Sequence, residues 1–300
     1  MEITNQVFDR IFKRIFSLSD AAIILLINGL FDTDHSPGSS IIYNNRESTN
    51  AALEHRFADI FITVAGEYHY HLEAQMTYDK SIVLRAFEYG FYHALETRSD
   101  HLSLCFPEPV IVYLSEQENV PEESVIHIHF AGQGTFDYKV KNYVYLRHPL
   151  AELNRKKLIV LIPFQVLRLR RLLLDSRKSK IFSPDKFQKL KEIVESDILN
   201  SIKANLMVGN ITRDDANQLV ELTNLLYENI VLYYQKNGGE QMKPLLPGAI
   251  ELPNDKYRIR IDELETQNSE LKGELAALRA QLEELKKKHS SPDNVSSPTA

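Results

Sequence analysis

Residues 56–89 read RFADIFITVAGEYHYHLEAQMTYDKSIVLRAFEY, and this stretch predicts a two-stranded hairpin followed by a helix. Gly66 marks the turn between the strands, because glycine adopts the positive φ that tight turns need. Three polar side chains, Asp59, Glu73 and Gln75, occupy strand positions where apolar ones would pack better. Because side chains alternate between the two faces of a strand, we expect all three on one face of the hairpin.

The apolar pattern also predicts how the two strands pair. A slip of one residue would set the apolar side chains of one strand against the polar ones of the other. With residues 65–67 as a three-residue turn, Ile60 pairs with Leu72 and Asp59 lies directly opposite Glu73. Two carboxylates so placed, with Cβ atoms roughly 5 Å apart, repel each other. A divalent cation with a preference for oxygen ligands, Mg²⁺ or Mn²⁺, would remove that repulsion.

The order of these residues resembles the PD-(D/E)XK nuclease superfamily. It is most similar to the branch of recombination-promoting nucleases, also described as transposases, in which Gln replaces the usual motif Lys. The resemblance extends over residues 159–171 and, more loosely, over the helical segment after residue 183, to about residue 234. The residues that carry it are Asp59, Glu73, Ala74, Gln75, Arg85 and Tyr89.

The resemblance implies a restriction-endonuclease-like fold, in which a mixed α/β (α+β) sheet is flanked by helices. It also implies metal-dependent hydrolysis of DNA phosphodiester bonds. Asp59 and Glu73, with the backbone carbonyl of Ala74, would hold one or two Mg²⁺ (or Mn²⁺) ions. Gln75 would orient the attacking water, because an amide cannot act as a base at neutral pH.

Further residues near the motif have two interpretations each. Arg85 and Tyr89 share a helical face; Arg85 would neutralise phosphate or hold a motif carboxylate, oriented by Tyr89, or simply pack on an aromatic ring. Glu54, just upstream, would join the metal ligands or be a solvated acid. His71, two residues before the motif Glu, is the histidine expected to touch substrate.

The Gln in place of Lys also favours a different function. A catalytically degenerate nuclease fold would act as a DNA- or protein-binding module and would need no divalent ion. A purely structural protein that dimerises through its C-terminal helix is a third class, but that class leaves Asp59 opposite Glu73 without an explanation.

Composition and net charge limit the classes of partner that the chain is expected to bind. The chain has 300 residues, of which 43% are hydrophobic, which suffices for a sizeable core. Its net charge of −6 argues against a protein that coats nucleic acid without specificity, but leaves room for a local basic groove. Nine basic residues and one acid lie between residues 155 and 180, and we expect this stretch either to contact phosphates or to be a solvated face.

The single cysteine, Cys105, cannot form an internal disulfide, which favours a reducing compartment and a cytoplasmic protein. We interpret it as a buried packing residue. The apolar run at residues 21–31 is too short to span a bilayer, so no membrane role is expected. It predicts instead a short helix that begins near Asp20 and ends at Gly29.

Domain boundaries follow from shifts in composition. Residues 1–235 form the predicted nuclease-like domain, whose last helix we expect Thr212 to cap. Residues 236–255 read as a linker, residues 256–288 as a coiled coil and residues 289–300 as a disordered tail. Asn268 at an a position favours a defined register and a parallel homodimer, with a different partner chain as the alternative. The seam consists of Ile261, Leu264, Asn268, Leu271, Leu275, Leu278, Leu282 and Leu285.

Overall fold

The computed structural model describes residues 11–44, 59–98, 102–114, 119–168, 192–235 and 271–273. The chain divides into two units, Met1–Ile250 and Glu251–Ala300. Their boundary falls inside the predicted linker. In the second unit only residues 271–273 are described; they are helical, and Leu271 is 62% exposed. The remaining residues of the predicted seam and tail, like Glu54 in the first unit, lie outside the described residues.

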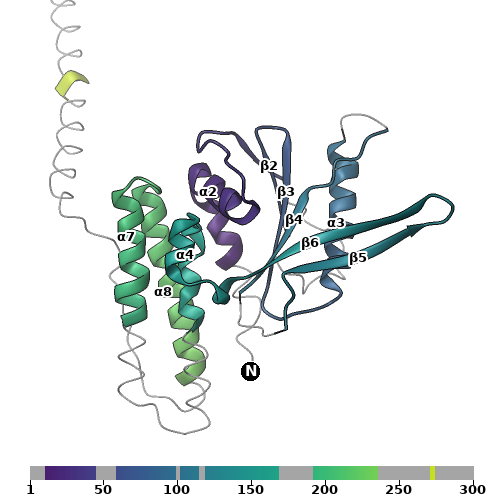
Figure 1. The fold of residues 1–300 in the computed structure, drawn as a ribbon. Helices are drawn as coiled ribbons and strands as arrows, with labels where there is room; N and C mark the ends of the chain where they lie inside the picture. Colours follow the sequence, from purple (N-terminus) through teal and green to yellow (C-terminus); the bar gives the residue numbers. More distant parts are fainter. Residues whose placement is uncertain are drawn as a thin grey trace, which may run out of the picture. The chain divides into compact units, whose positions relative to one another are not determined.

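The first unit is built on one six-stranded mixed sheet, with strand order β1-β2-β3-β4-β6-β5 (Figure 1). Strands β1 to β3 pair antiparallel, β3 pairs parallel with β4 and β4 with β6, and β5 pairs antiparallel with β6. The predicted class, a mixed sheet flanked by helices, is confirmed. The strands are β1 Ile41–Tyr43, β2 Asp59–Val64, β3 Tyr68–Gln75, β4 Glu108–Tyr113, β5 Glu123–Phe130 and β6 Gly134–Val144.

Helix α3, Ile82–Thr97, covers one face of the sheet. Its buried residues recur at helical spacing, so Ile82, Val83 and Ala86 share one side, where they pack with Ile111 of β4 and Val140 of β6. Each of the isoleucine and valine side chains in this contact contributes about 1.5–3 kcal/mol when it is fully buried. This contact fixes α3 over the face of β2 and β3 that carries the polar motif residues.

The other helices lie on the opposite face (Figure 1). Phe31, at the end of α2, packs on Tyr70 of β3 with ring centroids 4.5 Å apart, and Tyr70 points away from α3 by strand alternation. The 3-10 helix η4, Ile159–Val166, is buried along its whole length and contacts α2, α4 and α8. The elements are η1 Ile15–Ser17, α2 Asp20–Phe31, η3 Tyr145–Arg147, α4 Leu150–Arg155, η4 Ile159–Val166, η5 Ile193–Leu199, α7 Asn200–Met207 and α8 Arg213–Gln235.

No single helix among the described residues is long and apolar enough to cross a membrane. The segments Ile11–Ser17 and Asp20–Phe31 reach that length and composition only together, across a bend of 120°.

Asp215 joins the first turns of α2 and α8. Its carboxylate accepts hydrogen bonds from the backbone N–H and the hydroxyl of Ser19, both at 2.7 Å. It also accepts from the backbone N–H and the hydroxyl of Thr212, at 2.9 and 2.7 Å, while Thr212 Oγ1 caps α8 in return. Burial raises the pKa of Asp215, but these hydrogen bonds outweigh it and hold the pKa below its ordinary value.

We expect Asp215→Ala to lower the free energy of unfolding by about 3 kcal/mol at pH 7, because four hydrogen bonds to a charged group are lost. The lowered pKa means that this stabilisation is present above the unfolded pKa of about 4 and is lost as the pH falls through the folded pKa. Urea unfolding at pH 7 and near pH 3 measures both effects. Asp214→Ala, at an exposed neighbour in the same helical turn, is the control and should cost far less. An equal cost for Asp215→Ala at both pH values would contradict the assignment.

Candidate functional site

Strands β2 and β3 pair in the register that the sequence predicts. Val64 pairs with Tyr68 across the turn, and Asp59 lies opposite Glu73. Ala65 and Gly66 adopt positive φ values of 54° and 72°, which lets the chain reverse in three residues. The backbone of Asp59 is described, whereas its side chain lies outside the described part of the structure. The two motif positions are therefore cross-strand neighbours.

Glu73 is a buried carboxylate, 1% exposed, on the face of the sheet under α3. Its Oε1 accepts a hydrogen bond of 2.6 Å from Nε2 of Gln75, which lies on the same face of β3. The same oxygen accepts from the guanidinium of Arg85, which reaches down from α3 and forms an ion pair with it. A buried charge needs such a partner, because an isolated ion loses its hydration. Of the roles predicted for Arg85, this contact corresponds to holding a motif carboxylate.

Next to Glu73, three aromatic rings are stacked on each other. Phe61, opposite His71 in the hairpin, packs face to face on that ring with centroids 4.3 Å apart. On its other face it stacks on His93 of α3, at 4.5 Å. His71 is 1% exposed and packs on Phe61 between β3 and β2, and the expectation that it touches substrate stays a prediction. Helix α3 is thus attached to the hairpin at two places, through Arg85 and through His93.

The electrostatic surroundings of the site come from residues that the sequence reasoning missed. Asp79, just before α3, accepts hydrogen bonds of 2.8 Å from the backbone and hydroxyl of Ser81, and these hold the pKa of Asp79 low, with the charge of Arg85 adding to the effect. Burial raises the pKa of Tyr113 in β4, and Glu73 raises it further. The Asp-x-Ser pattern, typical of a turn in which the Asp side chain accepts from the backbone two residues later, was the readable signal for Asp79.

The donor atoms suit a hard divalent ion. Of the three predicted ligands, Glu73 has a carboxylate and Ala74 a backbone carbonyl, and Mg²⁺ prefers oxygen ligands. Within the described residues, no three His, Cys, Asp or Glu side chains come together as a metal-binding group. The second predicted carboxylate, that of Asp59, lies outside those residues. A cation on Oε1 of Glu73 would have to compete with the guanidinium of Arg85.

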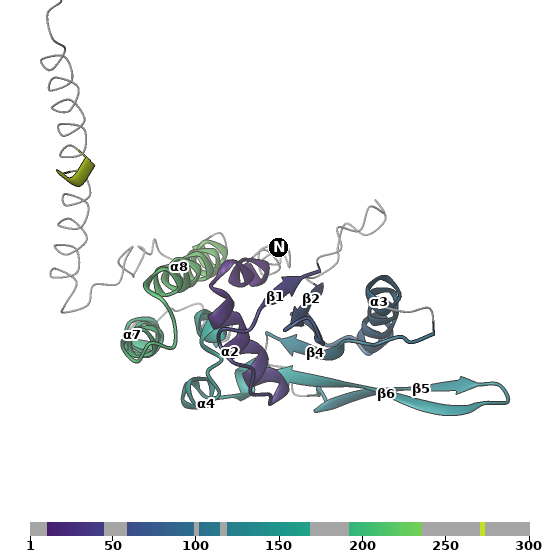
Figure 2. The same ribbon diagram turned by 90° about the horizontal axis from the view of Figure 1, so that it is seen from above.

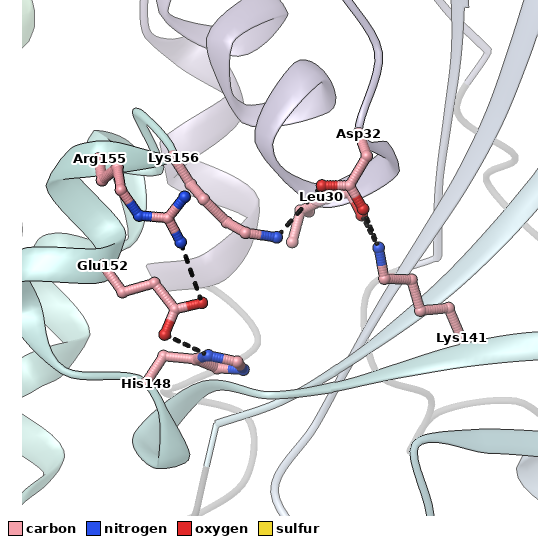
Figure 3. A network of polar contacts seen from close by, with 7 residues as sticks. All are labelled: Leu30, Asp32, Lys141, His148, Glu152, Arg155 and Lys156. Carbon is pink, nitrogen blue, oxygen red and sulfur yellow. Dashed lines mark hydrogen bonds and ion pairs between the residues drawn. The ribbon is translucent and has the colours of Figure 1, made fainter.

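The basic stretch predicted to contact phosphates begins on the other face of the sheet, beside α2 (Figure 3). Lys156 donates to Asp32 at 3.2 Å, and Lys141 of β6 donates to the same carboxylate at 2.8 Å. Hydrogen bonding from Lys141 is the main cause that lowers the pKa of Asp32. Arg155 lies 4.0 Å from Glu152, which His148 also contacts at 3.0 Å. The described charged side chains of this cluster therefore form ion pairs that connect α2 to α4 and β6.

Arg168, further along the same stretch, points inward. It donates hydrogen bonds to the carbonyl oxygens of Leu146 and His148, at 3.3 and 3.0 Å. The basic residues from Arg170 to Lys180 lie outside the described residues. Cys105 is exposed, so its interpretation as a buried packing residue is wrong; the loop after α3 carries it on the surface.

Comparison with known proteins adds no relative: no family model matches this chain, and neither a curated protein nor a solved structure matches it.

Proposed function

We propose that this chain is a Mg²⁺-dependent (or Mn²⁺-dependent) DNA endonuclease of the PD-(D/E)XK type, in the recombination-promoting nuclease branch, with a restriction-endonuclease-like fold. One observation carries the proposal. Glu73 is a buried carboxylate beneath α3, bonded to Gln75 two residues later and cross-strand from Asp59. A packing role alone gives no reason to bury a carboxylate beside a second acidic position.

Each motif residue has a distinct part in the proposed reaction. Mg²⁺ held by the carboxylates of Asp59 and Glu73 and the carbonyl of Ala74 would lower the pKa of a water and stabilise negative charge on the phosphate. Gln75 uses its amide nitrogen to hold Glu73, which leaves its amide oxygen to accept a proton of the attacking water and orient it. Arg85 balances the charge of Glu73 in the absence of metal.

The partners follow from the same proposal. DNA is the substrate, and two copies of the chain join through the helix at residues 256–288. A single cysteine with no internal disulfide suits the reducing cytoplasm.

Arg85 gives the proposal a test that does not depend on activity. We expect Arg85→Met to bind Mn²⁺ about tenfold more tightly at pH 8, because a competing positive charge is removed from Oε1 of Glu73. Electron paramagnetic resonance of free Mn²⁺ measures this affinity. Arg98→Met, at the exposed end of α3, is the matched control. If Arg85→Met bound Mn²⁺ more weakly than the parent, Arg85 would stabilise the metal-bound state rather than compete with the metal.

The alternative function is a degenerate nuclease fold that binds DNA or a protein without cutting. Two observations favour it: Gln75 stands where the superfamily has Lys, and Arg85 already supplies a positive charge to Glu73. Supercoiled plasmid, incubated with the protein and Mg²⁺ or with a chelator, separates the two functions. Nicking that requires the metal supports the endonuclease; gel retardation of the plasmid without nicking supports the binding module.

A further inference from the structure

Strand β5 forms the outer edge of the sheet and belongs to a long projecting hairpin. It is last in the strand order, and among the described residues no strand pairs with its outer side. Figure 2 shows the β5–β6 hairpin extending past α3, away from the other strands. An unpaired edge presents a row of backbone donors and acceptors to any other strand.

The direction of these backbone groups can be read from β6. The carbonyl of Glu122 accepts from the N–H of Asn142 in β6, at 2.8 Å, and the carbonyl of Phe130 closes the turn with Gln133 at 2.9 Å. Even-numbered residues of β5 therefore direct their backbone groups toward β6. Because these groups alternate along an antiparallel strand, those of Val125, His127 and His129 point to the outer edge.

This edge lacks the usual protection against pairing. Residues 124–130 read SVIHIHF, without lysine, proline or acid. The register with β6 is continuous from Glu123 opposite Lys141 to Phe130 opposite Gly134, so no bulge bends the strand. Charged residues, prolines and bulges are the devices by which natural sheets block edge pairing. Their absence over these residues leaves the edge open to another strand.

The end of the hairpin is also apolar on the side that faces α3. Ile126 and Ile128 pack partly against the core under α3, but Phe136 of β6, opposite Ile128, is 58% exposed, and Phe130 at the end of β5 is 52% exposed. A two-stranded hairpin by itself is at best marginally stable in water. A third strand alongside β5 would pair its free backbone groups and shield part of this apolar surface.

We propose that β5 pairs antiparallel with β5 of a second copy, about a twofold axis near Ile126 and His127, so that the two sheets become continuous. The strand is complementary to itself. With the axis at His127, Ile126 of each copy lies opposite Ile128 of the other. With the axis at Ile126, Glu123 of each copy lies opposite His129 of the other. Neither register sets two acids against each other, and a twofold axis makes every contact twice.

Charge argues against a nucleic acid at this edge. Residues 124–130 have no lysine or arginine to meet phosphates, and Glu88 and Glu96 are exposed on the neighbouring helix α3. The inference is independent of the proposed nuclease function, because it requires neither a metal nor DNA.

Disulfide formation tests the pairing in the full-length chain. In a Cys105→Ser background, Ile126→Cys and His127→Cys each place a thiol at one of the two possible axes. We expect one of them to form an interchain disulfide readily under mild oxidation. Thr135→Cys, exposed on the same hairpin but on β6, is the control and should link slowly. Equal linkage at all three positions, or none at either edge position, would overturn the proposal.

A second variant separates edge pairing from chance collision. Val125→Pro removes a backbone N–H that points outward and keeps the ladder to β6, so it should preserve thermal stability. Added to the cysteine variant that links, it should reduce the linked fraction at least tenfold; an unchanged fraction would overturn the proposal. Because the helix predicted at residues 256–288 would also join two copies, the position dependence of the disulfide is the readout, rather than particle mass.

Discussion

Glu73→Gln is expected to reduce Mg²⁺-dependent nicking of supercoiled plasmid by at least about a hundredfold, a loss of roughly 3 kcal/mol of transition-state stabilisation. Glutamine keeps the size of the side chain and can still accept from Arg85, but it lacks the charge that holds a divalent ion. Glu73 is buried beneath α3 and bonded to Gln75, whereas Glu67, the other hairpin acid whose side chain is described, is exposed in the turn and too far along the strand to replace it.

The matched control for this variant is Glu88→Gln, which removes an exposed acid from the same helix that supplies Arg85. It should leave nicking unchanged. Initial rates of plasmid relaxation, with thermal unfolding of each variant, separate a chemical loss from misfolding. Full activity in a well-folded Glu73→Gln protein would refute the proposed metal site, and the hairpin would then be a structural feature only.

Gly29→Ala is expected to destabilise the protein by about 3 kcal/mol, at the upper end of the cost of overpacking. A Cβ at this position would lie 2.5 Å from the carbonyl oxygen of Lys156 and 2.6 Å from Cδ2 of Leu158. The oxygen belongs to the backbone and cannot move aside cheaply. Alanine gains up to about 1 kcal/mol over glycine inside a helix, which is too little to offset the clash.

Chemical denaturation measures this loss, and Gly38→Ala is its control, because a Cβ at residue 38 has no atom within 4 Å. A Gly29→Ala protein as stable as the parent would show that α2 can move away from the segment at residues 156–158. A reduced transition slope would point to a loosened native state rather than to a simple clash.

The hairpin was predictable because its information is local. Alternation of side chains and the length of one turn suffice to set Asp59 opposite Glu73. Thr212 was predictable as a helix cap for the same reason, since its partner lies three residues away. The contact from Arg85 to Glu73 spans 12 residues and follows once the helix is placed over the hairpin.

Other features depend on contacts between segments that are distant in sequence. The sequence patterns did not predict those contacts. Gly29 was predicted to end a helix, yet α2 continues to Phe31. The glycine serves a different purpose: it leaves space for the backbone carbonyl of Lys156, which is far away in sequence. The stack of His71, Phe61 and His93 is complete only when α3 docks, because α3 supplies His93. Lys156 contacts Asp32 at the end of α2, 124 residues away in sequence, and no local pattern predicts that contact.

The bond between Asp215 and Ser19 has a consequence for the order in which the protein forms during translation. The two residues are 196 positions apart, so the ribosome has to add nearly the whole first unit after α2 emerges before its anchor exists. At 5–20 residues per second this delay is roughly 10–40 s. During that interval the first turn of the apolar α2 lacks the carboxylate of Asp215 that anchors it in the folded protein, and a chaperone can bind its apolar side chains.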